Sequence, residues 1–133
     1  MPIDLFGRIG AATKLIKTEY CALMGDDEFF IPSALDACIN QLDNSNDLIA
    51  CFGRCISFNF YKSTLHAKIS YEEMENYSLL DDEPHVRMIK HMNPYTSSTI
   101  YAVTRTNEWI NSMQIISAKE FIVSGEKPYT LFF

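Results

Sequence analysis

The chain lacks the segments that would direct it to or through a membrane. Charged residues interrupt every apolar run, so no stretch of the sequence resembles a transmembrane helix. The first ten residues, MPIDLFGRIG, lack the basic start and the long apolar centre of a secretory signal peptide. The sequence also has no internal repeat and no low-complexity tract. These absences predict a cytoplasmic protein without a transmembrane segment.

Basic residues are few compared with acidic ones. The chain has 11 lysines and arginines against 17 aspartates and glutamates, which gives a formal net charge of -6 at pH 7. A protein that binds the phosphate backbone of a nucleic acid usually presents a basic surface. The charge balance therefore argues against a nucleic-acid partner.

Cysteine pairs with the spacing of metal or redox motifs are also absent. The four cysteines, Cys21, Cys38, Cys51 and Cys55, lie in apolar segments, and no two of them form a CxxC motif. Buried, reduced cysteines are common in proteins that stay inside the cell. A disulfide framework is not expected in a chain of this size without an export signal.

What remains is the composition of an ordinary soluble globular protein. Hydrophobic residues make up 47% of the chain and charged residues 21%. A length of 133 residues suits one domain and is enough to bury a core without disulfides or metals. The length and composition therefore predict a single domain over residues 1–133.

Hydrophobic periodicity predicts alternating helices and strands. The predicted elements in chain order are a helix over 5–17, a strand over 19–24, a helix from Ser33, a strand over 48–60, a helix over 84–92, a strand over 98–105, a helix over 107–116 capped by Thr106, and a strand within 120–133. Helices that alternate with strands are typical of an α/β protein with a partly parallel sheet. The apolar end YTLFF fits either a terminal edge strand or a segment of a longer domain.

Three adjacent acids interrupt the pattern of the first half. Asp26, Asp27 and Glu28 follow a predicted strand and precede a helix that begins near Pro32. Hard divalent cations such as Mg²⁺ or Mn²⁺ prefer oxygen ligands, and ligands of open α/β sheets bind beyond the carboxyl ends of strands. The triplet is thus a candidate metal site for a diphosphate. The alternative is a solvated turn that also caps the helix.

The segment TEYCALMGDDEFFIPSALDACINQL resembles the central part of nucleotide-sugar glycosyltransferases with the GT-A fold. In that fold a strand ends in a DxD-type motif, which an apolar stretch, a proline and a helix follow. Two later segments, LLDDEPHVRMIKHM and TIYAVTRTNEW, resemble a family 2-like branch, the bacterial glycosyltransferase domain proteins. The resemblance extends from about Phe6 to Trp109. It implies a partial GT-A (Rossmann-like) three-layer domain with a mixed sheet flanked by helices.

The same resemblance implies a function and a cofactor. The reaction would transfer a sugar from a nucleoside-diphosphate donor to a hydroxyl of a sugar or polysaccharide acceptor, with Mn²⁺ or Mg²⁺. Counted back from Pro32, the two acids of a DxD motif would fall at Gly25 and Asp27, so the first acid is missing. Asp27 is then the best metal ligand, Asp26 a contact to the ribose or the metal, and Glu28 an alternative ligand. The N-terminal nucleotide-binding strands of the family have no counterpart before Met1.

An inverting transferase also needs a base to deprotonate the acceptor hydroxyl. Asp81, Asp82 and Glu83 are the candidates within the chain, and the base could also lie beyond Phe133. The alternative function is that of a non-catalytic, truncated remnant. Such a remnant would cover an exposed sheet edge or apolar face by self-association, as a dimer.

Other residues have simpler interpretations. His85 and His91 are poorly spaced for a zinc site, and we expect both to be exposed helix residues. Cys51 and Cys55 would project to one side of a single strand and pack in the core. Most of the aromatic residues are also expected in the core, including Phe58, Phe60, Tyr61, Tyr95, Tyr101 and Trp109.

Overall fold

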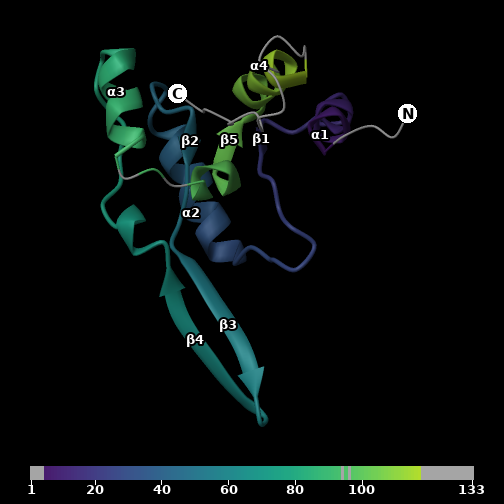
Figure 1. The fold of residues 1–133 in the computed structure, drawn as a ribbon. Helices are drawn as coiled ribbons and strands as arrows, with labels where there is room; N and C mark the ends of the chain where they lie inside the picture. The colour runs from purple at the N-terminus through teal and green to yellow at the C-terminus, as the bar shows by residue number, and fades with distance from the viewer. Residues whose placement is uncertain (1–4, 94, 96, 118–133) are drawn as a thin grey trace, which may run out of the picture. The chain divides into compact units, whose positions relative to one another are not determined.

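The computed structural model describes residues 5–93, 95 and 97–117, and these residues form two compact units. The first unit consists of residues up to Phe52 together with the chain from Ile100 onward. The second unit is the intervening segment, Gly53–Thr99. Figure 1 follows the chain through both units, which are described separately below.

A three-stranded sheet organises the first unit (Figure 1). Its strand order is β1 (Tyr20–Cys21), β5 (Val103–Arg105) and β2 (Ala50–Cys51), with β5 in the centre. Both pairings are antiparallel; Cys21 and Ala50 flank Thr104 from opposite sides. Mixed α and β structure was predicted, but the described strands include no parallel pair. The central strand β5 runs opposite to both β1 and β2, so the partly parallel sheet that was predicted is not found among them.

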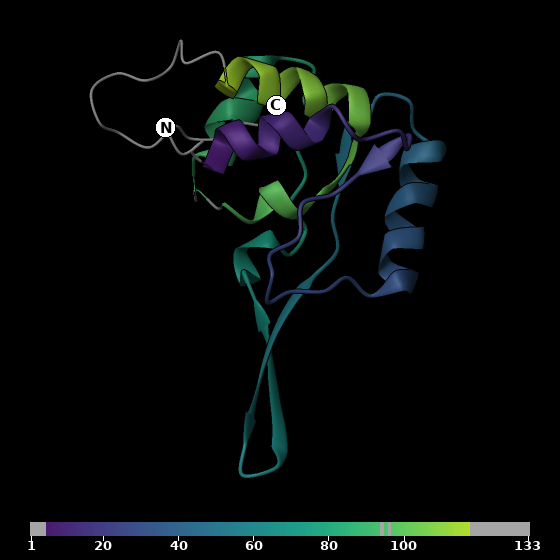
Figure 2. The ribbon, with the colours of Figure 1, turned by 90° about the vertical axis from the view of Figure 1, so that its right-hand side faces the viewer.

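Helices α1 (Leu5–Thr13) and α4 (Thr106–Ser117) pack against each other in the first unit (Figure 2). Trp109 and Met113 of α4 are buried. The predicted helix over residues 5–17 ends early, at Thr13. The Thr13 hydroxyl donates to the Gly10 carbonyl at 2.7 Å, and the next amides bond three residues back. Bonds of that kind tighten the last turn and compete with continuation of the helix.

Helix α2 (Pro32–Asp43) confirms the helix predicted from Ser33. Proline is favourable in the first turn because its missing N–H has no partner there anyway. The helix buries Cys38 and Leu42 against Val103 of the central strand. The partly buried side chains around this core are Tyr20, Leu35, Ile39, Leu48 and Cys51. The core of the first unit therefore lies between α2 and the sheet.

Arg105, the last residue of β5, joins the end of α2 to the sheet. Its Nη2 donates to the Leu42 carbonyl at 2.7 Å, and its Nε donates to the Leu48 carbonyl at 2.8 Å. The last carbonyls of a helix have no partner within the helix, and they carry its partial negative charge. The Leu42 carbonyl also accepts from the Ser45 amide at 3.2 Å, so Arg105 adds a second, charged donor and a complementary charge at this helix end. The sequence did not reveal this role.

A long β-hairpin dominates the second unit (Figure 1). Its strands, β3 (Cys55–Tyr61) and β4 (Thr64–Ser70), pair antiparallel over their full length. The predicted strand over 48–60 is therefore two strands, β2 and β3, and β4 was missed. Lys62 and Ser63 form the turn, with φ values of 47° and 65°. Positive φ at both turn positions suits the twist of a hairpin, but it is usually marked in a sequence by Asn or Gly.

The rest of the second unit is a short 3-10 helix, η1 (Glu72–Met74), and helix α3 (Pro84–His91). Helix α3 confirms the prediction over 84–92. The strand predicted over 98–105 is confirmed at its end, as β5, whereas its first half is a 3-10 turn, η2 (Ser98–Tyr101). The strand predicted within 120–133 lies outside the described residues. Among the residues that are described, no helix is long and apolar enough to cross a membrane.

Candidate functional site

The acidic triplet lies on the connection between β1 and α2 in the first unit. The chain leaves β1 without regular structure and turns at Asp26 and Asp27, whose side chains are exposed. The Gly25 amide donates to the Glu28 carboxylate, with 2.8 Å between the nitrogen and Oε2. A strand, an acidic turn and a helix with proline in its first turn therefore follow one another as predicted.

Gly25 has a local structural role in this turn. A Cβ atom added at this position would lie 2.9 Å from Oε2 of Glu28 and 3.3 Å from Oδ1 of Asp27. Contacts below 3.0 Å require an atom to shift. The nearest atom is the end of the flexible, exposed Glu28 side chain, so a side chain at position 25 would displace this carboxylate from the backbone amide at little cost. The position where a DxD motif would place its first acid is here occupied by the backbone donor of a tight turn.

The acids do not cap α2 through their side chains. The residue that precedes the helix is Ile31, and no side-chain hydrogen bond caps the helix. The Ala34 and Leu35 amides donate instead to the Ile31 carbonyl, at 2.9 and 3.1 Å. The capping part of the alternative interpretation is therefore wrong, whereas the exposure of Asp26 and Asp27 agrees with its solvated turn.

The fit of a divalent metal to this turn is incomplete. Three carboxylates within three residues supply the oxygen ligands that Mn²⁺ and Mg²⁺ prefer. Over the residues that the structure describes, however, no three His, Cys, Asp or Glu side chains are grouped so as to hold an ion. One carboxylate, that of Glu28, is already bonded to the Gly25 amide. The turn offers the right chemistry without a ready coordination shell.

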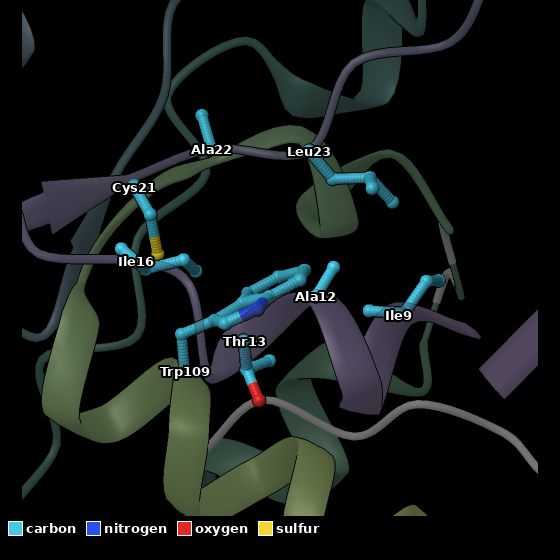
Figure 3. Close-up of a pocket in the computed structure, with 8 residues that line it drawn as sticks. All are labelled: Ile9, Ala12, Thr13, Ile16, Cys21, Ala22, Leu23 and Trp109. Carbon is cyan, nitrogen blue, oxygen red and sulfur yellow. The ribbon is translucent and has the colours of Figure 1, made fainter. Parts of the chain in front are cut away.

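An apolar pocket of about 170 Å³ opens beside β1 in the same unit (Figure 3). Its wall includes Cys21 and Leu23, which lie on the segment that runs from β1 toward the acidic turn. Figure 3 shows the Trp109 ring and the Cys21 sulfur among aliphatic side chains from α1. Burial raises the pKa of the Cys21 thiol. The thiol is thus held in its neutral form, which suits an apolar lining better than nucleophilic chemistry.

A second, more polar hollow of about 330 Å³ also belongs to the first unit. It is lined by Lys17, Thr18 and Glu19 ahead of β1 and by Asn107 and Glu108 at the start of α4. Hydroxyl, amide and charged groups of these types can bind the hydroxyls of a sugar. Sequence reasoning did not single out these residues, because they come together only through the pairing of β1 with β5.

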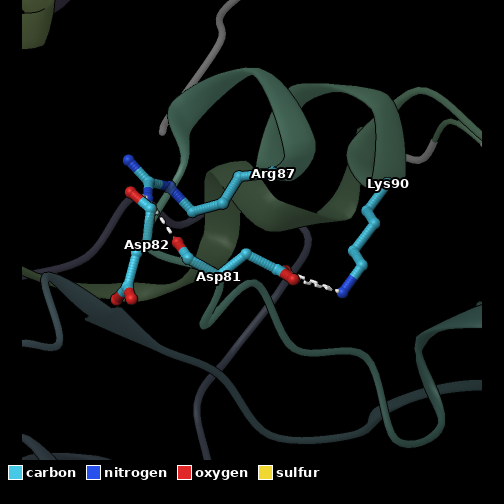
Figure 4. A network of polar contacts seen from close by, with 4 residues as sticks. All are labelled: Asp81, Asp82, Arg87 and Lys90. Atoms are coloured by element: carbon cyan, nitrogen blue, oxygen red, sulfur yellow. Dashed lines mark hydrogen bonds and ion pairs between the residues drawn. The ribbon is translucent and has the colours of Figure 1, made fainter.

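The second acidic run, Asp81 to Glu83, lies directly before α3 in the other unit. Figure 4 shows Asp81 and Asp82 with Arg87 and Lys90 of the helix. Arg87 Nη1 donates to the backbone carbonyls of Asp81 and Asp82, at 2.5 and 2.9 Å. Lys90 Nζ lies 2.8 and 2.7 Å from the two carboxylate oxygens of Asp81. Arg87 and Lys90 of α3 therefore hold the chain segment that leads into the helix.

The three candidate bases have different surroundings. The hydrogen bond from Lys90 lowers the pKa of the Asp81 carboxyl, with a smaller opposing effect of burial. A lowered pKa makes Asp81 a weaker proton acceptor. Asp82 and Glu83 are exposed, and Glu83 lies 3.7 Å from His85 Nδ1. The structure describes the two acidic segments in separate units and does not establish that they form one site.

The sequence did not predict a cluster in the second unit that consists of the buried His91 and two tyrosines, Tyr77 and Tyr95. His91 is only 1% exposed, so the expectation of an exposed helix residue is wrong for it, whereas His85 is exposed. The Tyr77 hydroxyl and His91 Nδ1 are 2.5 Å apart, and the Tyr95 ring lies 5.4 Å from the His91 ring, edge to face. Burial lowers the pKa of His91 and raises that of Tyr77. No sequence signal marked this cluster, because its members come from a loop, a helix end and the residues after it.

The cysteines follow the prediction only in part. All four are free thiols, as expected. Cys38 is buried, and Cys21 and Cys51 are half-buried, but Cys55 is exposed on β3. The prediction that Cys51 and Cys55 share one strand in the core is wrong, because the chain leaves the first sheet between them.

Comparisons of the chain with protein-family profiles, with curated proteins and with solved structures found no match.

Proposed function

We propose that the chain derives from metal-dependent, nucleotide-sugar glycosyltransferases and that the turn at Asp26–Glu28 is its donor-binding segment. The observation that carries this proposal is the order of elements in the first unit. A strand is followed by an exposed acidic turn and then by a helix with proline in its first turn. The mixed α and β structure is compatible with an α/β glycosyltransferase domain, and a GT-A arrangement is part of the proposal.

The proposed roles follow the resemblance of the sequence and the exposure of the side chains. Asp27 is the principal ligand of Mn²⁺ or Mg²⁺, and Asp26 contacts the ribose or the same metal. Glu28 becomes an alternative ligand only after its bond to the Gly25 amide breaks. The metal, when bound, would neutralise the diphosphate of the donor. The acceptor is a sugar or a polysaccharide with a free hydroxyl.

Among the candidate bases, Asp82 and Glu83 suit proton abstraction better than Asp81. Asp81 is paired with Lys90, and its lowered pKa disfavours the protonated form that a general base must reach. Asp82 and Glu83 carry exposed side chains. We therefore assign the base, if it lies within the chain, to one of these two residues.

Calorimetric titration tests the donor site. The chain is titrated with Mn²⁺, and then with a panel of nucleotide sugars in the presence of Mn²⁺. We expect binding of a nucleotide sugar that needs the metal, and we expect Asp27→Asn to weaken it at least about tenfold through loss of a charged ligand. Asp36→Asn is the matched control, since Asp36 is an exposed acid on α2 in the same unit. Absence of metal-dependent binding, or equal losses in the two variants, would count against the proposal.

A second candidate function is the non-catalytic one, a remnant that self-associates as a homodimer. A specific observation favours it: six large hydrophobic side chains of the hairpin β3–β4 are exposed, and five of them, all but Tyr61, are aliphatic or phenylalanine side chains. The two candidates make different predictions, because self-association requires neither metal nor nucleotide.

A further inference from the structure

The register of the hairpin sorts its side chains into two faces of opposite character. Residues directly opposite each other in an antiparallel pair point to the same face, and neighbours along a strand point to opposite faces. The pairs Ile56–Ile69, Phe58–Ala67 and Phe60–Leu65 therefore form one face, which we call the apolar ribbon face. The pairs Cys55–Ser70, Ser57–Lys68, Asn59–His66 and Tyr61–Thr64 form the other, the polar ribbon face.

The apolar ribbon face is well exposed. Phe60 is 73% exposed and Leu65 55%; Ile56, Ile69 and Phe58 are 50%, 47% and 45% exposed. These values overturn the expectation that Phe58 and Phe60 belong to the core. Tyr61, on the polar ribbon face, was also expected there and is 61% exposed. The predicted alternation of apolar and polar residues along β3 is correct, but the apolar face, which was expected to be buried, is exposed to solvent.

A ribbon of two strands requires a partner layer. Isolated two-stranded hairpins are marginally stable in water, and a third strand or a packed apolar face is needed to stabilise them. Contiguous apolar patches with a polar surround usually mark an interaction surface. Here the polar ribbon face can remain in water, so a single layer over the other face is sufficient.

The charges of the hairpin are compatible with two copies meeting at this face. Residues 55–70 contain Lys62 and Lys68 and no acid, although the whole chain has a net charge of -6. Lys68 lies on the polar ribbon face and Lys62 in the turn. The six residues of the apolar ribbon face carry no charge. Two such faces can therefore approach each other without placing like charges in the contact.

The available area supports a second copy as the occupant. Large apolar side chains of this kind have surfaces of about 150–250 Å² each, so five of them that are about half exposed offer on the order of 500 Å². Two copies would then bury on the order of 1,000 Å², near the lower limit for a specific interface.

We propose that the protein forms a two-fold symmetric homodimer in which the apolar ribbon faces of two copies pack against each other. The contact is isologous, so each residue of the face serves in both halves of the interface. This proposal specifies the surface of the self-association candidate and is independent of the glycosyltransferase proposal.

Two substitutions at neighbouring positions test the surface. Leu65→Lys places a charge on the apolar ribbon face, and His66→Lys places the same side chain on the polar ribbon face. Light scattering coupled to size-exclusion chromatography, over a concentration series, measures the mass. We expect a dimer for the unmodified chain and for His66→Lys. For Leu65→Lys we expect a dissociation constant at least about tenfold higher, because two lysines are forced into one apolar contact.

A photo-crosslinker provides a second measurement that does not depend on the stability of a variant. Placed at position 60, on the apolar ribbon face, it should yield covalent dimers; placed at position 59, on the polar ribbon face, it should not. A monomer at all concentrations would overturn the proposal, as would equal effects of the two lysine variants. A monomer that sediments with lipid vesicles, or that crosslinks only within its own chain, would assign the face to a different occupant and would also overturn it.

Discussion

The guanidinium of Arg105 lies over the ring of Tyr20, with 5.6 Å between the central carbon and the ring centroid. Its Nη1 is also 3.3 Å from the Tyr20 hydroxyl, which donates to Asp43 Oδ1 at 2.6 Å. The hydrogen bond to Asp43 raises the pKa of the Tyr20 hydroxyl. An arginine at the end of the central strand thereby connects an edge strand to the last residue of α2.

Arg105→Met should destabilise the first unit by about 2–3 kcal/mol, since hydrogen bonds to charged groups contribute about 1.5–3 kcal/mol each. Urea unfolding followed by Trp109 fluorescence measures the change, because Trp109 is the only tryptophan and is buried in this unit. Lys14→Met is the matched control. Lys14 is an exposed cation of the same unit, so its loss should cost less than about 1 kcal/mol. Equal losses would contradict the special role of Arg105.

Lys90→Met should raise the pKa of Asp81 toward its ordinary value, because the hydrogen bond from Lys90 is the main cause of the lowered pKa. Carboxyl carbon chemical shifts, followed by NMR through an acid titration, measure the pKa directly. Lys68→Met, on the hairpin, is the control and should leave Asp81 unchanged. If Asp81 titrates identically in the wild type and Lys90→Met, the ion pair does not persist in solution.

Acidification should destabilise the second unit through His91. Burial lowers the folded-state pKa of His91, so below about pH 6.5 the unfolded chain binds a proton that the folded chain does not. Stability should therefore fall as the pH drops from the unfolded pKa toward the folded one. Urea unfolding by circular dichroism at pH 7.5 and at pH 5.5 measures this loss.

The His91→Gln variant provides the comparison. It should be less stable than the wild type at neutral pH, but its stability should depend less on pH in this window. His85→Gln removes an exposed histidine and should retain the full dependence. If the stability of His91→Gln falls between pH 7.5 and pH 5.5 as much as that of the wild type, groups other than His91 cause the loss.

The four thiols should react with a disulfide reagent at very different rates. Cys55 is exposed and should react first, whereas Cys38 is buried and should react last. Burial, with the neighbouring Cys51 thiol, raises the pKa of Cys38 to about 12, so almost no thiolate is present at neutral pH. Cys55→Ser should remove the fast phase alone. A fast phase that persists in this variant would place another thiol at the surface.

Local patterns predicted the elements whose stability is local. Helices α2 and α3 have proline in their first turn and a helical spacing of apolar residues, and both were found near their predicted bounds. The hairpin was missed because its turn uses Lys62 and Ser63 instead of the residues that normally adopt positive φ. Without that signal, residues 48–60 appeared to be one strand.

In the candidate site too, local features could be predicted from the sequence and long-range contacts could not. The exposed turn between a strand and a helix could be predicted from Asp26, Asp27 and the position of Pro32. The bond between Gly25 and Glu28 could not, because it depends on the backbone path of the turn. Arg105 bonds to the carbonyl of Leu42, and His91 lies within hydrogen-bond distance of the Tyr77 hydroxyl. Both partners are distant in sequence, so no local pattern identifies them.

The position of Trp109 determines what optical experiments on this protein can detect. As the only tryptophan, it reports the packing of α4 in the first unit, while Tyr77 and the hairpin have no such probe in the second. A fluorescence transition alone would leave the unfolding of the hairpin unobserved. Comparison of the fluorescence midpoint with that of circular dichroism would show whether the two units unfold cooperatively or in separate steps.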